Sequence, residues 1–85
     1  GELLDYIELD QSEFVVAKMR PPKELEGFTL GEARPMSRYG VKVIGTLHPG
    51  RPFRYANADT RIDSDDILIV SGTSPAVIAF SERPH

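Results

Sequence analysis

The sequence predicts a small α+β domain with the element order β-α-β-β-β-α, in which helices cover one face of a small sheet. Several short runs of apolar and β-branched residues have the composition of strands, and turn residues separate them. Two other segments open with helix-start signals. The 85 residues leave room for one such domain. Because so small a core encloses little space, we expect the domain to dimerise and to hold any ligand on its surface or between two copies.

The first strand is predicted at residues 14–19, whose β-branched and aromatic side chains fit a pleated surface. The Pro-Pro pair that follows ends it, because proline has no amide hydrogen to donate to the ladder. The apolar leader at residues 3–7 is too short to be stable alone. We therefore interpret residues 1–12 as a linker from a preceding domain and residues 13–83 as the folded domain.

A short helix is predicted next, at residues 30–34. Thr29 and Glu32 have the spacing of a capping box, in which each side chain accepts a hydrogen bond from the backbone amide of the other residue. Pro35 follows directly and is expected to stop this helix, because its ring cannot be accommodated in a continuing helical turn. This helix therefore separates the first strand from the second.

The second and third strands are predicted at residues 41–47 and 53–55, on either side of a Pro-Gly turn. In the second strand, Val41 and Val43 alternate with Lys42, so the valines should face the core and the lysine should face away from it. The side opposite the valines is where water or a ligand would lie.

The fourth strand is predicted at residues 67–70, which are apolar at every position and therefore belong in the centre of the sheet. The polar residues 63–66 form a tight turn before this strand. Ser74 as N-cap and Pro75 at the first helical position then predict a last helix. These elements complete the predicted order.

Charge and composition exclude several classes of protein. The net charge of −3 argues against a DNA- or RNA-binding protein, which needs a broad cationic face. No apolar run is long enough to span a bilayer. The absence of cysteine excludes thiolate chemistry and agrees with a reducing cytosol. Residues 33–58 nevertheless contain five basic residues and no acid, which suits either a small anionic ligand or a plain solvated face.

Three strings of residues resemble the RCK C-terminal (TrkA-C) domain. Residues 25–32, Leu-Glu-Gly-Phe-Thr-Leu-Gly-Glu, match the family's L-x-G-x-x-L-x-E. Residues 38–41, Arg-Tyr-Gly-Val, match its basic-Tyr-Gly-aliphatic string, and residues 66–72, Asp-Ile-Leu-Ile-Val-Ser-Gly, match its D-x-L-x-V-x-G. The strings occur in the right order and at the right separations, and the resemblance covers residues 13–82. Residues 4–9 also resemble the linker before this domain in KtrA-type potassium-uptake regulators.

The resemblance implies a cytoplasmic regulatory domain that forms a homodimer and biases a potassium or other cation transporter or channel between states. Such a domain would lie at the inner face of the cell membrane through its transporter. In KtrA-like members the ligand is cyclic di-AMP, held across the dimer interface, and no other cofactor is implied. The alternative is a dimerisation module of a transporter regulator that binds no small molecule. An enzyme is not expected, because no nucleophile, base and orienting acid share a recognisable spacing.

Carried over to this chain, the family's ligand site covers the start of the second strand, that strand, and the loop after the third strand. The residues expected there are Pro35, Met36, Arg38, Tyr39, Lys42, Val43, Ile44, Tyr55, Ala56, Asn57 and Ala58. The chain departs from KtrA-like members at two positions, with Met36 in place of an arginine and Lys42 in place of an asparagine.

Individual roles within this predicted ligand site follow from side-chain chemistry. Arg38 and Lys42 could each meet a phosphate, and Met36 or Tyr39 could pack on adenine. For Arg38 the alternative is a merely exposed arginine, and for Tyr39 it is a place in the core. The sequence leaves both alternatives open.

Other polar residues give weaker signals. His48 lacks an evident partner for a metal or catalytic role and no metal site is expected. The aspartates of residues 63–66 resemble the start of a calcium loop, but its glycine and distal glutamate are absent, so a solvated turn is expected. Residues 71–74 could present free amides to an anion, or could simply cap the last helix.

Overall fold

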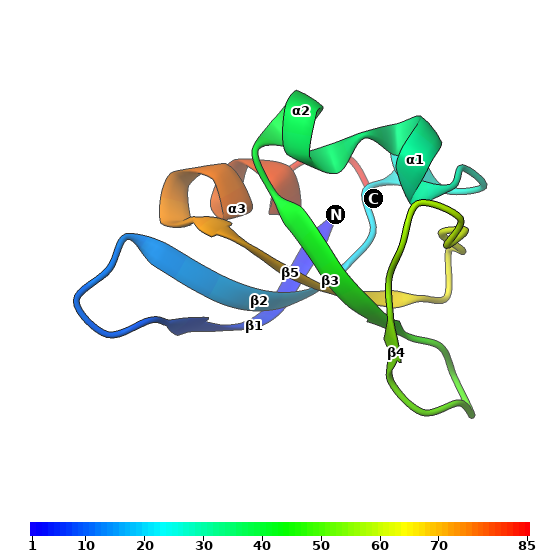
Figure 1. The fold of residues 1–85 in the computed structure, drawn as a ribbon, viewed down its shortest axis with the longest axis horizontal. Coiled ribbons are helices and arrows are strands. Elements are labelled where there is room, and N and C mark those ends of the chain that lie inside the picture. The colour runs from blue at the N-terminus through cyan, green and yellow to red at the C-terminus, as the bar shows by residue number, and fades with distance from the viewer.

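The computed structural model describes all 85 residues and contains a five-stranded antiparallel sheet with the strand order β1-β2-β5-β3-β4. The strands are β1 (Glu2–Glu8), β2 (Phe14–Arg20), β3 (Lys42–Leu47), β4 (Arg54–Tyr55) and β5 (Ile67–Thr73). The helices are the 3₁₀ turn η1 (Lys23–Leu25), α1 (Leu30–Ala33), α2 (Pro35–Tyr39) and α3 (Ser74–Ser81). All three α-helices lie on one side of the sheet (Figure 1). The predicted α+β class and one-sided helix layer are confirmed.

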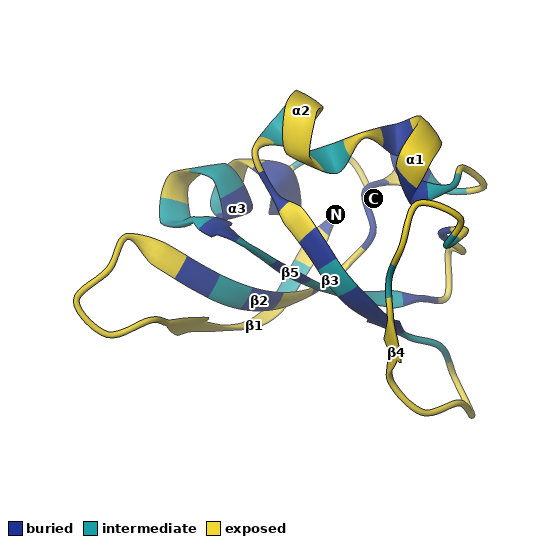
Figure 2. Ribbon diagram, viewed as in Figure 1, coloured by how far each residue is buried: buried dark blue, intermediate teal, exposed yellow.

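Strand β5 is the centre of the sheet, as its apolar sequence predicts. It pairs with β2 on one side and with β3 on the other. Buried residues alternate with less buried ones along β2 and β5, and in β3 the alternation is interrupted at Gly45 and Thr46, which are both buried (Figure 2). The helix layer covers the buried positions, which form one core of thirteen residues. Its largest fully buried side chains are Phe80, Met19, Leu25, Ile62 and Leu68.

The leader segment differs from the prediction. Glu2–Glu8, expected to be part of a linker, forms strand β1 and pairs antiparallel with β2 along its whole length. Local pattern could not show this, because most of its side chains stay exposed and its stability comes from pairing with β2. That residues 1–12 connect this domain to a preceding one stays a prediction.

The region between residues 29 and 40 contains two short helices instead of one. The capping box of Thr29 and Glu32 is present, with the Glu32 amide 3.2 Å from the Thr29 hydroxyl oxygen. Helix α1 ends one residue earlier than predicted, and Arg34 then takes a left-handed conformation with φ 51°. Pro35 begins α2 instead of only stopping α1, because a proline is well tolerated in the first turn of a helix.

Smaller corrections concern the ends of two elements. The N-cap of α3 is Thr73, whose hydroxyl oxygen accepts a hydrogen bond from the Ala76 amide at 3.3 Å, so the predicted cap Ser74 is the first helical residue. The third strand is shorter than predicted and begins at Arg54. Both shifts are within the usual uncertainty of element ends.

Candidate functional site

An apolar groove lies between the two short helices, the start of β3 and the segment after β4. We call it the α2–β3 groove, and its volume is about 480 Å³. Its lining residues are Leu30, Gly31, Arg34, Pro35, Met36, Ser37, Val41, Lys42, Val43, Ala56, Asn57 and Ala58. Seven of the eleven predicted ligand residues are therefore neighbours here: Pro35, Met36, Lys42, Val43, Ala56, Asn57 and Ala58.

Backbone hydrogen bonds hold the far wall of this groove in place. The Ala56 amide donates to the Ile44 carbonyl at 3.0 Å, and the Gly31 amide donates to the Ala58 carbonyl at 2.9 Å. A Cβ on Gly31 would lie 3.1 Å from that same carbonyl oxygen, so α1 lies close to this segment and a side chain at residue 31 would need only a small displacement of the wall. Segment 56–58 is thus fixed to β3 at one end and to α1 at the other.

The lining of the groove carries positive charge and contains no acidic residue. Arg34 and Lys42 are its two charged lining residues, and both are exposed. Lys42 projects away from Val41 and Val43, which are buried, as the strand alternation predicts. Arg34 was not among the predicted ligand residues, because only the turn between α1 and α2 brings it to the groove. Its left-handed backbone is uncommon for a residue with a side chain and is of the kind that often marks functional sites.

Arg38 and Tyr39 do not line the groove. They lie on α2, a helix that the sequence interpretation did not predict in the segment before the second strand. A guanidinium nitrogen of Arg38 is 4.0 Å from the Glu24 carboxylate, and its guanidinium lies 5.1 Å from the centre of the Tyr39 ring. The Tyr39 ring in turn packs on Phe80 at a centroid distance of 5.1 Å. In this arrangement Tyr39 contributes to the core and Arg38 to a surface cluster.

Glu24 and Arg83 complete this surface cluster, and the pKa values in it are shifted. The hydrogen bond from Arg83 lowers the pKa of Glu24 and raises the pKa of Arg83. Burial raises the pKa of Tyr39, and the neighbouring Glu24 carboxylate adds to the increase. The cluster ties η1, α2 and the C-terminal residues together, which is a structural role.

The remaining predicted ligand residues are also outside the groove. Ile44 lies at an irregularity in the β3–β5 pairing and is only half-buried. Tyr55 is 82% exposed and packs edge-on against Phe53 at 5.2 Å. Tyr55 instead lines a second pocket, on the other side of β4.

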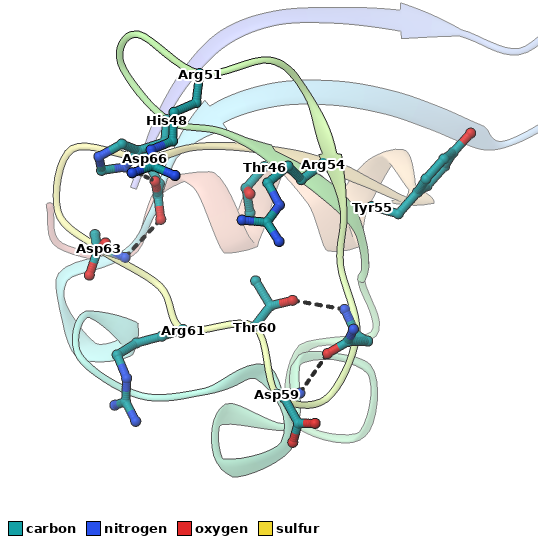
Figure 3. A pocket seen from close by; sticks show the side chains of 11 residues that line it. Thr46, His48, Arg51, Arg54, Tyr55, Asp59, Thr60, Arg61, Asp63 and Asp66 are labelled. Atoms are coloured by element: carbon teal, nitrogen blue, oxygen red, sulfur yellow. Dashed lines mark hydrogen bonds and ion pairs between the residues drawn. The ribbon is translucent and has the colours of Figure 1, made fainter.

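This second pocket, which we call the charged cleft, also has a volume of about 480 Å³. Figure 3 shows its lining residues, which are Thr46, His48, Arg51, Arg54, Tyr55, Asn57, Asp59, Thr60, Arg61, Asp63 and Asp66. His48 does have a partner here, because its Nδ1 lies 2.7 Å from Oδ1 of Asp66. The sequence interpretation missed this pair because eighteen residues separate its members.

Asp66 caps the turn that the sequence predicts before the central strand. Its Oδ2 accepts a hydrogen bond from the Asp63 amide at 2.9 Å. Residues 71–74 act mainly as a helix start, since the Ser74 amide already donates to the Glu13 carbonyl at 2.8 Å and Thr73 caps the Ala76 amide.

None of the helices combines the length and apolar character needed to cross a membrane.

No protein-family model matches the chain, and no curated protein sequence matches it. Solved structures do. The crystal structure of the GsuK RCK domain matches with a TM-score of 0.74 and 22% identity, over 100% of this chain and 19% of that one. The GsuK channel matches with a TM-score of 0.77 and 22% identity, over 100% of this chain and 16% of that one. The chain thus spans less than a fifth of either and has the RCK C-terminal fold that its sequence motifs predict.

Proposed function

We propose that this chain is the regulatory domain of a potassium or other cation channel or transporter, and that it binds cyclic di-AMP in the α2–β3 groove. The fold it shares with the RCK domain of a channel supports the regulatory role. The observation that carries the ligand assignment is the lining of the groove, which combines apolar walls with two cations and no acid. Such a domain acts at the cytoplasmic face of the membrane through its transporter and is not an enzyme.

The chemistry of the groove suits a nucleotide with phosphate charges. Met36 is 58% exposed at the mouth of the groove, and its thioether can pack on an adenine face. Arg34 and Lys42 can neutralise phosphate oxygens, and the arginine can do so with a forked pair of hydrogen bonds. Asn57 adds an amide that can hydrogen-bond a base edge or a ribose hydroxyl. This assignment gives Arg34 the phosphate-binding role that the sequence interpretation gave to Arg38.

Symmetry favours a site shared by two copies. Cyclic di-AMP has two equivalent halves, and a homodimer with a two-fold axis presents each binding residue twice. Each phosphate can then meet the same residues from a different chain. The groove is open at Met36, so a second copy can cover the half of the ligand that the first leaves in solvent.

Titration calorimetry with cyclic di-AMP tests this proposal. We expect one ligand for every two chains, and sedimentation should show a shift toward dimer when the ligand is added, because ligand binding and dimer formation share one coupling free energy. Cyclic di-GMP, which has the same charge and different bases, is the matched control and should bind more weakly. One ligand per chain on a strict monomer would contradict the shared site.

A second candidate function is a dimerisation module that binds no small molecule. The observation in its favour is the set of exposed apolar side chains on the β1–β2 hairpin, among them Ile7 at 66% and Phe14 at 49% exposure. Dimerisation in sedimentation with no heat from either dinucleotide would support this function over the first.

A further inference from the structure

The charged cleft contains a histidine and two aspartates whose ligating atoms converge. His48 follows β3, and Asp63 and Asp66 lie in the turn before β5, so two segments that are distant in the chain meet at one end of the cleft (Figure 3). One ligating atom from each lies within 4.8 Å of the other two. We propose that these three residues bind a divalent transition-metal ion of the Zn²⁺, Co²⁺ or Mn²⁺ class.

The carboxylate of Asp66 is held in position for such a role. Asp66 is only 4% exposed, and its Oδ2 is fixed by the Asp63 amide at 2.9 Å. Its other oxygen, Oδ1, points to His48 Nδ1 at 2.7 Å. A metal ion bound by both atoms would replace this hydrogen bond, and the two side chains would move slightly apart to admit it, because metal–ligand bonds are about 2.0–2.2 Å long. The Asp63 amide would then be an outer-shell donor that orients a ligating carboxylate.

The ligand types decide which metal ions fit. One neutral imidazole and two carboxylates supply one nitrogen, two oxygens and two negative charges, which balance a divalent cation. Calcium and magnesium prefer shells made only of oxygen, whereas imidazole favours Zn²⁺ and its transition-metal neighbours. In this proposal His48 completes a site with two aspartates that the sequence interpretation assigned to a solvated turn.

Three protein ligands leave at least one tetrahedral position open. His48 and Asp63 are accessible from the cleft, so this position faces its interior. Arg51 and Arg54 line the same cleft and make it suitable for an anion or water at the open position, whereas the Arg61 guanidinium donates to the Gly27 carbonyl oxygen. The site is separate from the α2–β3 groove, and it does not depend on the function proposed above.

Co²⁺ titration of the untagged 85-residue chain tests the site. We expect one Co²⁺ per chain, followed by its visible absorption bands and by calorimetry, and Zn²⁺ should displace it. His48→Ala and Asp63→Asn should each weaken Co²⁺ binding by more than about tenfold. Asp63→Asn removes a ligand without removing a hydrogen bond, since the Asp63 side chain forms none. Circular dichroism of each variant shows whether the fold is intact.

Two matched variants control for general effects of charge and of histidine. Asp65→Asn removes the same charge from the same exposed turn, and His85→Ala removes the other histidine of the chain. Both should bind Co²⁺ as the unmodified chain does. The proposal is overturned by no binding up to about 1 mM Co²⁺. It is equally overturned if Asp65→Asn or His85→Ala reduces binding as much as His48→Ala, because the metal would then lie elsewhere.

Discussion

The α2–β3 groove and the charged cleft have the same volume of about 480 Å³, but their linings differ. The groove has apolar walls and two cations without an acid. The cleft combines three arginines and a histidine with three aspartates, and the charged side chains can neutralise one another. Pocket size therefore says little about ligand class in this domain. The groove suits an anion with an apolar body, and the cleft suits a cation held by its carboxylates.

Strand β3 contributes residues to both pockets and pairs with the central strand β5, so the largest expected effect comes from removing the support of β5. Leu68 on β5 is fully buried, so Leu68→Ala should lower the free energy of unfolding by about 2–5 kcal/mol. Chemical denaturation measures the loss. Ile7→Ala is the matched control, because Ile7 is 66% exposed and its truncation should change stability by about 0.5 kcal/mol or less. Equal effects of the two substitutions would contradict the central place of β5.

A second prediction compares the loss of stability when a methyl group is added beside each pocket, at Gly45 for the cleft and at Gly31 for the groove. A Cβ on Gly45 would clash with the Phe53 ring and with the Arg54 carbonyl oxygen, at the base of the hairpin that forms the cleft. Gly45→Ala should therefore destabilise the domain by about 1–3 kcal/mol through overpacking.

Gly31→Ala is the matched substitution beside the groove. Its Cβ would meet the Ala58 carbonyl oxygen at 3.1 Å, a milder contact that the better helix propensity of alanine offsets. Thermal and chemical unfolding should show a large loss for Gly45→Ala and little change for Gly31→Ala. The reverse order would mean that the hairpin adapts more easily than the groove wall.

A third prediction concerns charge in the groove. Lys42→Ala and Arg34→Ala should each weaken cyclic di-AMP binding by about 1–3 kcal/mol, the range for a hydrogen bond to a charged group. Arg38→Ala is the control, because Arg38 is directed to Glu24 outside the groove and its loss should leave the affinity nearly unchanged. Calorimetry measures all three. A larger effect of Arg38→Ala would return the phosphate role to the residue that the family resemblance indicates.

The smallest expected effect lies in the surface cluster outside both pockets. The pKa of Glu24 is lowered in the folded chain, mainly by its hydrogen bond with Arg83. A carboxyl group with a lowered pKa in the folded chain stabilises the fold at pH values above the unfolded-state pKa of about 4.3. This stabilisation is lost as the pH falls through the folded-state pKa. Glu24→Gln should thus be less stable than the unmodified chain at neutral pH, and the two should converge in acid. Glu13→Gln, at an exposed residue without an ion pair, should show no such difference when unfolding is followed from neutral pH to acid.

Local chemistry in the sequence accounts for most of the fold. The capping box at Thr29, the alternation around Lys42 and the apolar run of β5 each depend on neighbouring residues, and the structure contains all three. Such signals are readable because helix capping and strand alternation act over only a few residues. Strand β1 has no comparable signal, since it is stabilised by pairing with β2 and not by its own pattern.

The α2–β3 groove and the charged cleft are formed by residues that are distant in the sequence, so local patterns could not predict their full composition. The sequence by itself determined that segments 35–44 and 55–58 hold a basic, partly apolar surface, and seven of the eleven residues expected there line one groove. Only the tertiary structure decided that Arg34 joins this groove while Arg38 does not, because Arg34 lies in the left-handed turn between α1 and α2, whereas Arg38 lies on α2 beside Glu24. It also decided that His48 meets Asp63 and Asp66, because β3 and β5 pair antiparallel and bring the end of one strand beside the start of the other.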